Sequence, residues 1–133
     1  MIVCFDTNVL VSAVATRGLC ADIVNAALAE HQLIVGKTVL AELRRVLLQK
    51  LRLPIAAVDE MDGFLRLHAT VIEAAPAIEI RVLDDNDGAV LAEAVAGKAD
   101  VLVTGDQDLL ELAAEAPIKI LSPRGFWELL RSA

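Results

Sequence analysis

Residues 1–10 read MIVCFDTNVL, a short apolar run that ends on a charged residue followed by two polar ones. Ile2–Phe5 has the length and the β-branched content of a strand that is buried on both faces. Such a strand belongs in a parallel sheet covered by helices, and it would deliver Asp6 to the end of that sheet. The stretch therefore predicts an α/β fold with a carboxylate at the sheet edge.

The rest of the chain alternates apolar runs of strand length with segments of helical periodicity. Further strands are predicted at Leu33–Val35, Val71–Glu73, Val101–Thr104 and Ile118–Leu121. Helices are predicted at Thr7–Ala15, Ala21–Glu30, Thr38–Lys50, Ala56–His68, Asn86–Ala96 and Ser122–Arg131, with a loop between Pro76 and the DDNDG stretch at 84–88. This alternation is typical of a parallel sheet with helices on both faces. With 133 residues, 56% of them hydrophobic, the chain suits a single domain spanning residues 1–133.

The composition narrows the classes of function. A formal charge of −7 argues against broad electrostatic binding to nucleic acid, but not against nucleic-acid chemistry in which cations bridge carboxylates and phosphates. The two cysteines, Cys4 and Cys20, form neither a disulfide framework nor a zinc motif, which favours an intracellular, cytoplasmic location. No basic start of a signal peptide precedes Arg17, and no apolar run reaches the roughly 20 residues of a membrane span, so no membrane association is expected.

Two acidic residues follow predicted strands. Asp6 comes directly after the first strand, and Asp106 comes two residues after the Val101–Thr104 strand. In open α/β sheets ligands bind outside the carboxyl ends of the strands. The sequence therefore predicts both carboxylates at one ligand-binding edge.

Two further carboxylates lie on helices. Asp87 precedes Val90 by three residues, so it shares the side of its helix that faces the sheet. Glu42 lies about one turn into the Thr38–Lys50 helix, on the flank of its apolar stripe. The hypothesis is that these two converge with Asp6 and Asp106.

Four carboxylates at one edge would repel one another. Two unit charges 4 Å apart interact by about 1 kcal/mol in water and about 4 kcal/mol at an effective dielectric near 20. A divalent cation removes this penalty, and Mg²⁺ or Mn²⁺ suits carboxylate oxygens. Such sites commonly serve phosphoryl chemistry, in which the ions position and deprotonate water and stabilise the leaving oxygen.

Each carboxylate also has an ordinary structural interpretation. Asp6 could be a helix N-cap, Asp87 one of several caps in DDND, Asp106 a turn residue and Glu42 a solvated helix residue. The metal hypothesis therefore depends on the four arriving together. A calcium EF-hand is excluded at LDDNDG, because with Gly88 as the sixth position its first and twelfth positions are Leu83 and Ala94.

Three stretches resemble the PIN-domain family of metal-dependent ribonucleases. They are FDTNVLVSA at 5–13, VLAELRRVL at 39–47 and LDDNDGAVLAEAVAGKADVLVTGDQDLL at 83–110. Their order and spacing look closest to the VapC-like toxins of toxin–antitoxin pairs. The resemblance implies a three-layer fold with a mostly parallel sheet of about five strands, Mg²⁺- or Mn²⁺-dependent endoribonuclease activity, homodimers and an antitoxin partner.

The resemblance also implies site residues. The family's metal-binding acidic residues would fall on Asp6, Glu42, Asp87 and Asp106, with Asp108 a fifth candidate and Asp84 a weaker one. Polar residues near the site would be Thr7 and Thr104, while Asn8 would orient Asp6 through hydrogen bonds. The family's closing motif commonly reads Asp-Pro-Asp-Asp, whereas residues 84–87 here read DDND, which puts a role for Asp84 in doubt.

A basic group follows Glu42, and it consists of Arg44, Arg45, Lys50 and Arg52. It is either a contact surface for RNA phosphates or a solvated helix face. His31 and His68 are isolated from each other in the sequence and do not indicate a histidine base.

The leading hypothesis is a metal-dependent endoribonuclease that acts on RNA. A second is a PIN-like binding module with weak or no catalysis, which acts through an antitoxin or through self-association. A third, a phosphatase of the haloacid dehalogenase type, requires Asp-x-Asp after the first strand, and Asn8 stands at the second position.

Overall fold

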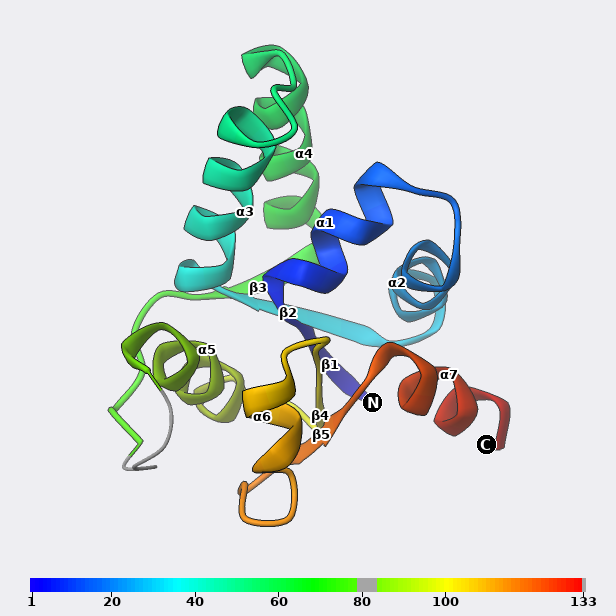
Figure 1. The fold of residues 1–133 in the computed structure, drawn as a ribbon, viewed down its shortest axis with the longest axis vertical. Helices are drawn as coiled ribbons and strands as arrows, with labels where there is room; N and C mark the ends of the chain where they lie inside the picture. Colours follow the sequence, from blue (N-terminus) through cyan, green and yellow to red (C-terminus); the bar gives the residue numbers. More distant parts are fainter. Residues whose placement is uncertain (79–83, 133) are drawn as a thin grey trace.

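A five-stranded parallel sheet forms the centre of the molecule, and the computed structural model describes residues 1–78 and 84–132 of the chain (Figure 1). The strand order is β3-β2-β1-β4-β5, and every neighbouring pair is parallel. The strands are β1 (Ile2–Phe5), β2 (Gln32–Gly36), β3 (Ala69–Ile72), β4 (Val101–Val103) and β5 (Lys119–Leu121). The predicted α/β class and the predicted parallel sheet are confirmed.

Seven helices in the described residues cover the sheet. They are α1 (Thr7–Ala15), α2 (Leu19–Glu30), α3 (Lys37–Gln49), α4 (Ile55–His68), α5 (Asp85–Ala96), α6 (Gln107–Glu111) and α7 (Pro123–Ser132). The connections through α1–α4 lead from β1 to β2 and then to β3 at one edge of the sheet. The connections through α5 and α6 lead in the opposite direction, from β3 to β4 and then to β5 at the other edge. Right-handed crossovers therefore place α5 and α6 on the opposite face, away from α2 and α7 (Figure 1).

The predicted elements are all present, with small differences at their ends. The strand predicted at Val71–Glu73 begins earlier, at Ala69, and ends at Ile72, because it pairs in parallel with β2. Helix α6 was not predicted, since five residues are too few to show a helical period. Residues 79–83 of the predicted loop lie outside the described part of the chain.

The core is built around β1, as its apolar sequence requires. Val3, Cys4 and Phe5 are at most 1% exposed. The ring of Phe5 meets that of Phe126 edge-on, with centroids 5.8 Å apart, so α7 is anchored to the sheet by an aromatic pair. Burial raises the pKa of the Cys4 thiol to about 12, which keeps the thiol protonated and apolar.

Across the described residues, no single helix has the length and apolarity to cross a membrane. Helices α1 and α2 meet those criteria only as a pair that is bent by 106°, and then by length and composition alone.

Candidate functional site

The site lies where the direction of the sheet connections reverses, between β1 and β4. Phe5 pairs with Val103, so Asp6 and Thr104 leave their strands at the same level. The backbone N–H of Asp6 still donates to the Val103 carbonyl at 2.9 Å, which holds the two chain segments together beyond the strands. This is the position at which open α/β sheets bind ligands.

Asp6 is buried and serves as the hub of a hydrogen-bond network. Its Oδ2 accepts from Thr104 Oγ1 at 2.7 Å and from Asn8 Nδ2 at 3.2 Å, and its Oδ1 accepts from the Thr7 N–H at 2.7 Å. The last bond makes Asp6 the N-cap of α1. The capping interpretation and the position at the sheet edge therefore both apply to this residue.

The network continues from β1 to the loop after β4. Thr104 Oγ1 accepts the Asp106 N–H at 2.9 Å, and Asn8 Oδ1 accepts the Gly105 N–H at 2.9 Å. The orientation of Asp6 is thus tied to the backbone that carries Asp106. The buried hydroxyl of Thr7 has no hydrogen-bond partner among the described residues.

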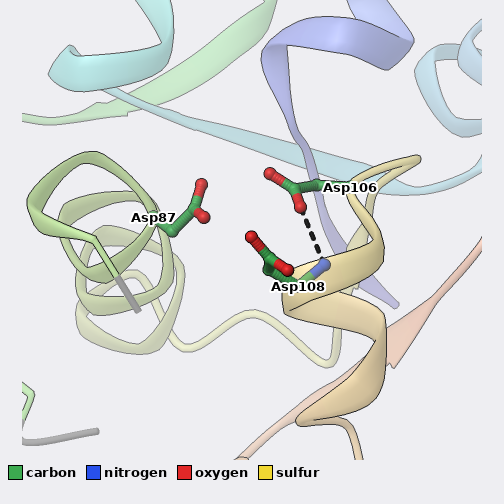
Figure 2. A group of neighbouring side chains, drawn as sticks. All are labelled: Asp87, Asp106 and Asp108. Atoms are coloured by element: carbon green, nitrogen blue, oxygen red, sulfur yellow. Dashed lines mark hydrogen bonds between the residues drawn. The ribbon is translucent and has the colours of Figure 1, made fainter. Parts of the chain in front are cut away.

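Three carboxylates face one another beside this network, and we call them the acidic cluster. Asp87, Asp106 and Asp108 each offer an oxygen, and these oxygens all lie within 4.8 Å of one another. Figure 2 shows Asp87 reaching from α5 toward Asp106 and Asp108 at the start of α6. Asp106 caps α6 by accepting the Asp108 N–H at 2.9 Å. Helix α6, missed by the sequence analysis, is therefore the element that brings Asp108 into the cluster.

The inward orientation of Asp87 follows from the capping of α5. Asp84 is the N-cap residue, and its Oδ1 accepts the Asp87 N–H at 2.7 Å. Because Asp84 fills the capping role, the Asp87 side chain is free to turn toward the sheet edge, where it is 6% exposed. The exposed Asp84 itself lies outside the acidic cluster.

The acidic cluster disfavours the charged form of Asp87. Burial, and after it the negative charges of Asp106, Asp84 and Asp6, together raise the pKa of Asp87 to about 7. A carboxyl group that is half protonated near neutrality indicates a site with more negative charge than its surroundings balance. A cation at this position reverses the effect.

The pKa of Asp6 is also raised. Burial is the largest cause, and the charges of Glu42 and Asp106 act in the same direction. The hydrogen bonds from Thr104 and Thr7 oppose the rise by favouring the carboxylate. Glu42 is thus close enough to act electrostatically on Asp6, although neither residue belongs to the acidic cluster of three.

Glu42 is half-buried on α3 and borders an open pocket, which we call the α3 pocket. The pocket is lined by Lys37, Thr38, Ala41, Glu42, Arg45 and Asn86. It therefore spans from the N-terminal half of α3 to the first turn of α5, which also carries Asp87. Lys37, which the sequence analysis did not single out, adds a second cation beside Arg45.

The predicted pair of RNA-contacting arginines is divided by the fold. Arg45 lines the α3 pocket, whereas Arg44 turns to α4 and pairs with Asp59 at 2.6 Å. Neighbouring residues on a helix point about 100° apart, so Arg45 lies at the α3 pocket and Arg44 lies on the surface between α3 and α4.

Glu93 is a buried acidic residue that the sequence analysis missed. It is 4% exposed on α5, and both of its oxygens accept from Thr38 at the start of α3. A signal was present in the sequence, since Glu93 follows Val90 by three residues and so lies on the same stripe as Asp87.

Comparisons with known proteins agree with this arrangement. The structure resembles VapBC2 from Rickettsia felis bound to a DNA fragment from their promoter (TM-score 0.64, 19% identity, 91% of this chain and 97% of that one). It also resembles VapBC-1 from nontypeable Haemophilus influenzae (TM-score 0.64, 15% identity, 93% of this chain and 99% of that one). A third similar structure is a PilT N-terminus domain protein from Sulfolobus solfataricus P2 (TM-score 0.57, 12% identity, 99% of this chain and 92% of that one).

No curated protein matches the chain in sequence. The sequence model of the PIN domain, however, matches residues 2–108, a range that contains all the acidic residues described above. With the fold, the sheet-edge position of the carboxylates and this match in agreement, the chain belongs to the PIN-domain family.

Proposed function

We propose that the protein is a metal-dependent endoribonuclease and the toxin component of a toxin–antitoxin pair. The observation that carries the proposal is the acidic cluster, in which oxygens of Asp87, Asp106 and Asp108 approach within 4.8 Å at the switch point of the sheet. Membership of the PIN-domain family and the likeness to VapBC structures support it.

The residues present suit a hard divalent cation. The cluster offers carboxylate oxygens only, which Mg²⁺ and Mn²⁺ favour over the nitrogen and sulfur ligands that zinc commonly takes. The raised pKa of Asp87 shows that its charge is poorly compensated in the protein alone. We therefore assign Asp87, Asp106 and Asp108 as the ligands, with Asp6 and Glu42 as nearby carboxylates of the same site.

The bound cation supplies activation of water and neutralisation of charge on the scissile phosphate. The chain supplies the geometry. Asp6 fixes Thr104, and Thr104 in turn holds the backbone of Asp106, so a buried carboxylate restrains an exposed loop. The described residues place no histidine against this network, so a protein-side general base is not part of the proposal.

The α3 pocket is proposed as the path of the RNA backbone toward the cluster. Lys37 and Arg45 can contact phosphates there, because a guanidinium and an ammonium both bind phosphate oxygens. Arg45→Ala is expected to weaken RNA binding by about tenfold, the effect of roughly 1.4 kcal/mol from a lost phosphate contact. Fluorescence anisotropy with labelled RNA at two salt concentrations measures it.

Arg44→Ala is the matched control for this prediction. It removes a cation of the same kind one residue away, but that side chain pairs with Asp59 on the surface between α3 and α4. Its RNA affinity should stay within about twofold of the wild-type value, since an exposed ion pair contributes little. Equal losses in both variants would contradict the assignment of the α3 pocket.

We further propose that residues 1–133 form a single domain. The protein would act in the cytoplasm as a homodimer and would bind an antitoxin. The similar structures from Rickettsia felis and Haemophilus influenzae are VapBC assemblies, which motivates the search for a partner of this chain.

A binding module with little catalysis is the second candidate function. The observation that favours it is the apolar surface of α4, where Phe64 is 46% exposed and Leu67 is 79% exposed. Phe64 also borders an apolar groove formed with α1 and α2. Exposed apolar groups of this kind commonly mark protein contacts.

RNA cleavage with and without metal tests the proposed function and separates the two candidates. We expect cleavage with Mn²⁺ or Mg²⁺, loss with EDTA, recovery when metal is added back, and loss in Asp106→Asn. The Asn side chain can still accept the Asp108 N–H, so the variant is expected to fold. Cleavage that persists in EDTA or in the variant refutes the metal site, and metal binding without cleavage of any RNA favours the binding module.

A further inference from the structure

The N-terminus of α3 has no capping side chain of its own. The N-cap position is Gly36, which makes no side-chain capping bond. The role is taken by Glu93 of α5, which follows Thr38 by 55 residues in the chain. Its Oε1 accepts the Thr38 N–H at 2.9 Å, and its Oε2 accepts the Thr38 hydroxyl at 2.5 Å. We call this contact the α3–α5 clamp.

The clamp is closely packed. A Cβ placed at Gly36 would lie 2.0 Å from Glu93 Oε1 and 2.7 Å from Glu93 Cβ, which is far inside any permitted contact. Glycine at position 36 therefore allows the carboxylate to reach the first turn of α3. The need for glycine at position 36 follows from the packing of α5 against the start of α3, and it is apparent only in the tertiary structure.

The charge of Glu93 is compensated by the helix that it caps. The side chain is 4% exposed and forms no salt bridge with any cation in the described part of the chain. A buried carboxylate is unfavourable unless hydrogen bonds satisfy it. Here Thr38 supplies two donors, and the N-terminus of α3 supplies the positive end of the helix dipole.

The clamp joins the two helices that carry the site. Thr38 precedes Glu42 by four residues, about one turn of α3, and Glu93 follows Asp87 by six residues on α5. We propose that Glu93 is a positioning residue, which sets Glu42 and the α3 pocket in place relative to the acidic cluster. This inference rests on the proposed metal-dependent function, and it adds a residue that is neither a member of the cluster nor part of the pocket lining.

Three variants separate positioning from general stability. Glu93→Ala removes the clamp. Glu93→Gln keeps it, because the amide can accept the Thr38 N–H and donate to the hydroxyl. Leu47→Ala destabilises the far end of α3, where the side chain is 1% exposed, and leaves the clamp intact.

The experiment measures Mn²⁺ affinity by titration calorimetry and amide hydrogen exchange along α3, at a temperature where all variants are folded. Glu93→Ala should weaken Mn²⁺ binding by about tenfold, the lower end of the loss that follows when supporting contacts of a metal site are removed, because Glu42 is then no longer held beside the acidic cluster. It should also speed exchange at Thr38 and around Glu42 while leaving the last turn of α3 protected. Glu93→Gln and Leu47→Ala should bind Mn²⁺ within about threefold of the wild type.

Several outcomes overturn the inference. It fails if Glu93→Ala binds Mn²⁺ normally, if Leu47→Ala weakens binding equally, or if Glu93→Gln behaves like Glu93→Ala. If the wild type binds no Mn²⁺, the proposed function fails instead, and the exchange data then decide the clamp alone. Uniform acceleration along all of α3 in Glu93→Ala would reduce its role to stability and refute positioning.

Discussion

Asp87→Asn is expected to lower Mn²⁺-dependent RNA cleavage and Mn²⁺ affinity by about 100-fold or more, and at the same time to stabilise the metal-free protein. Loss of an outer contact to a metal ligand already lowers affinity or activity about 10- to 100-fold, so loss of a ligand charge should exceed that range. Asp87 is the most buried member of the acidic cluster.

The gain in stability has a separate physical cause. A pKa raised from 3.8 to about 7 corresponds to a penalty of about 4 kcal/mol on the charged form of Asp87. Relaxation of the surroundings reduces this value, so we expect Asn to raise the free energy of unfolding at pH 8 by about 1–3 kcal/mol. A variant that loses activity while gaining stability is typical of a functional site rather than of a structural one.

Urea unfolding in EDTA and cleavage with Mn²⁺ measure the two halves of this prediction. Asp85→Asn is the matched control, because Asp85 lies in the same first turn of α5 but is exposed and outside the acidic cluster. It should leave cleavage within about twofold and stability within about 0.5 kcal/mol of wild type. If Asp87→Asn is less stable than the wild type without metal, the electrostatic account of the cluster is wrong.

The second large effect is expected in the pH dependence. Asp87 has a higher pKa in the folded state than the 3.8 of an unperturbed aspartate, so the folded state holds its proton between about pH 4 and pH 7. The stabilising contribution of this group is complete below pH 4 and is lost as the pH rises through 7. The metal-free protein should therefore lose stability in that window, by up to about 1.4 kcal/mol per pH unit from this residue. Asp6, whose pKa is also raised, contributes with the same sign.

Mn²⁺ affinity should have the opposite pH dependence. Below about pH 7 the cation must displace a proton from Asp87. The dissociation constant of Mn²⁺ should therefore rise about tenfold for each unit by which the pH falls. Calorimetric titrations between pH 5.5 and 8.5, in two buffers of different ionisation enthalpy, report both the affinity and the protons released. An affinity that stays flat over this range, with no proton release, would exclude Asp87 as a ligand that titrates near neutrality.

The layout of the fold was predictable because local signals agreed along the chain. Ile2–Phe5 was identified as a buried strand from its apolar, β-branched residues, and the long helix at 38–50 from the period of its leucines and valines. Helix α6 was the exception, since a helix of five residues is held by its cap, Asp106, and by packing rather than by a periodic pattern.

The candidate site was predictable only in part. Asp6, Asp87 and Asp106 were found from their distance to strand ends and apolar stripes, and the structure brings Asp87 and Asp106 together with Asp108. Two features escaped: the different directions of Arg44 and Arg45, and the capping of α3 by Glu93. The helical positions of these side chains can be inferred from the sequence, but the neighbours that lie against them, Asp59 for Arg44 and Thr38 for Glu93, cannot.

The sequence by itself determined the α/β class, the order of elements and the polar groups that follow β1 and β4, because strand and helix periods are local properties of the chain. Only the tertiary structure decided that Asp6 holds Thr104 beside the site through a hydrogen bond, that the acidic cluster contains Asp108, and that Glu93 joins α5 to α3. The reason is physical: charges and hydrogen bonds act over a few ångströms in space, and the fold joins residues up to 98 positions apart to satisfy them.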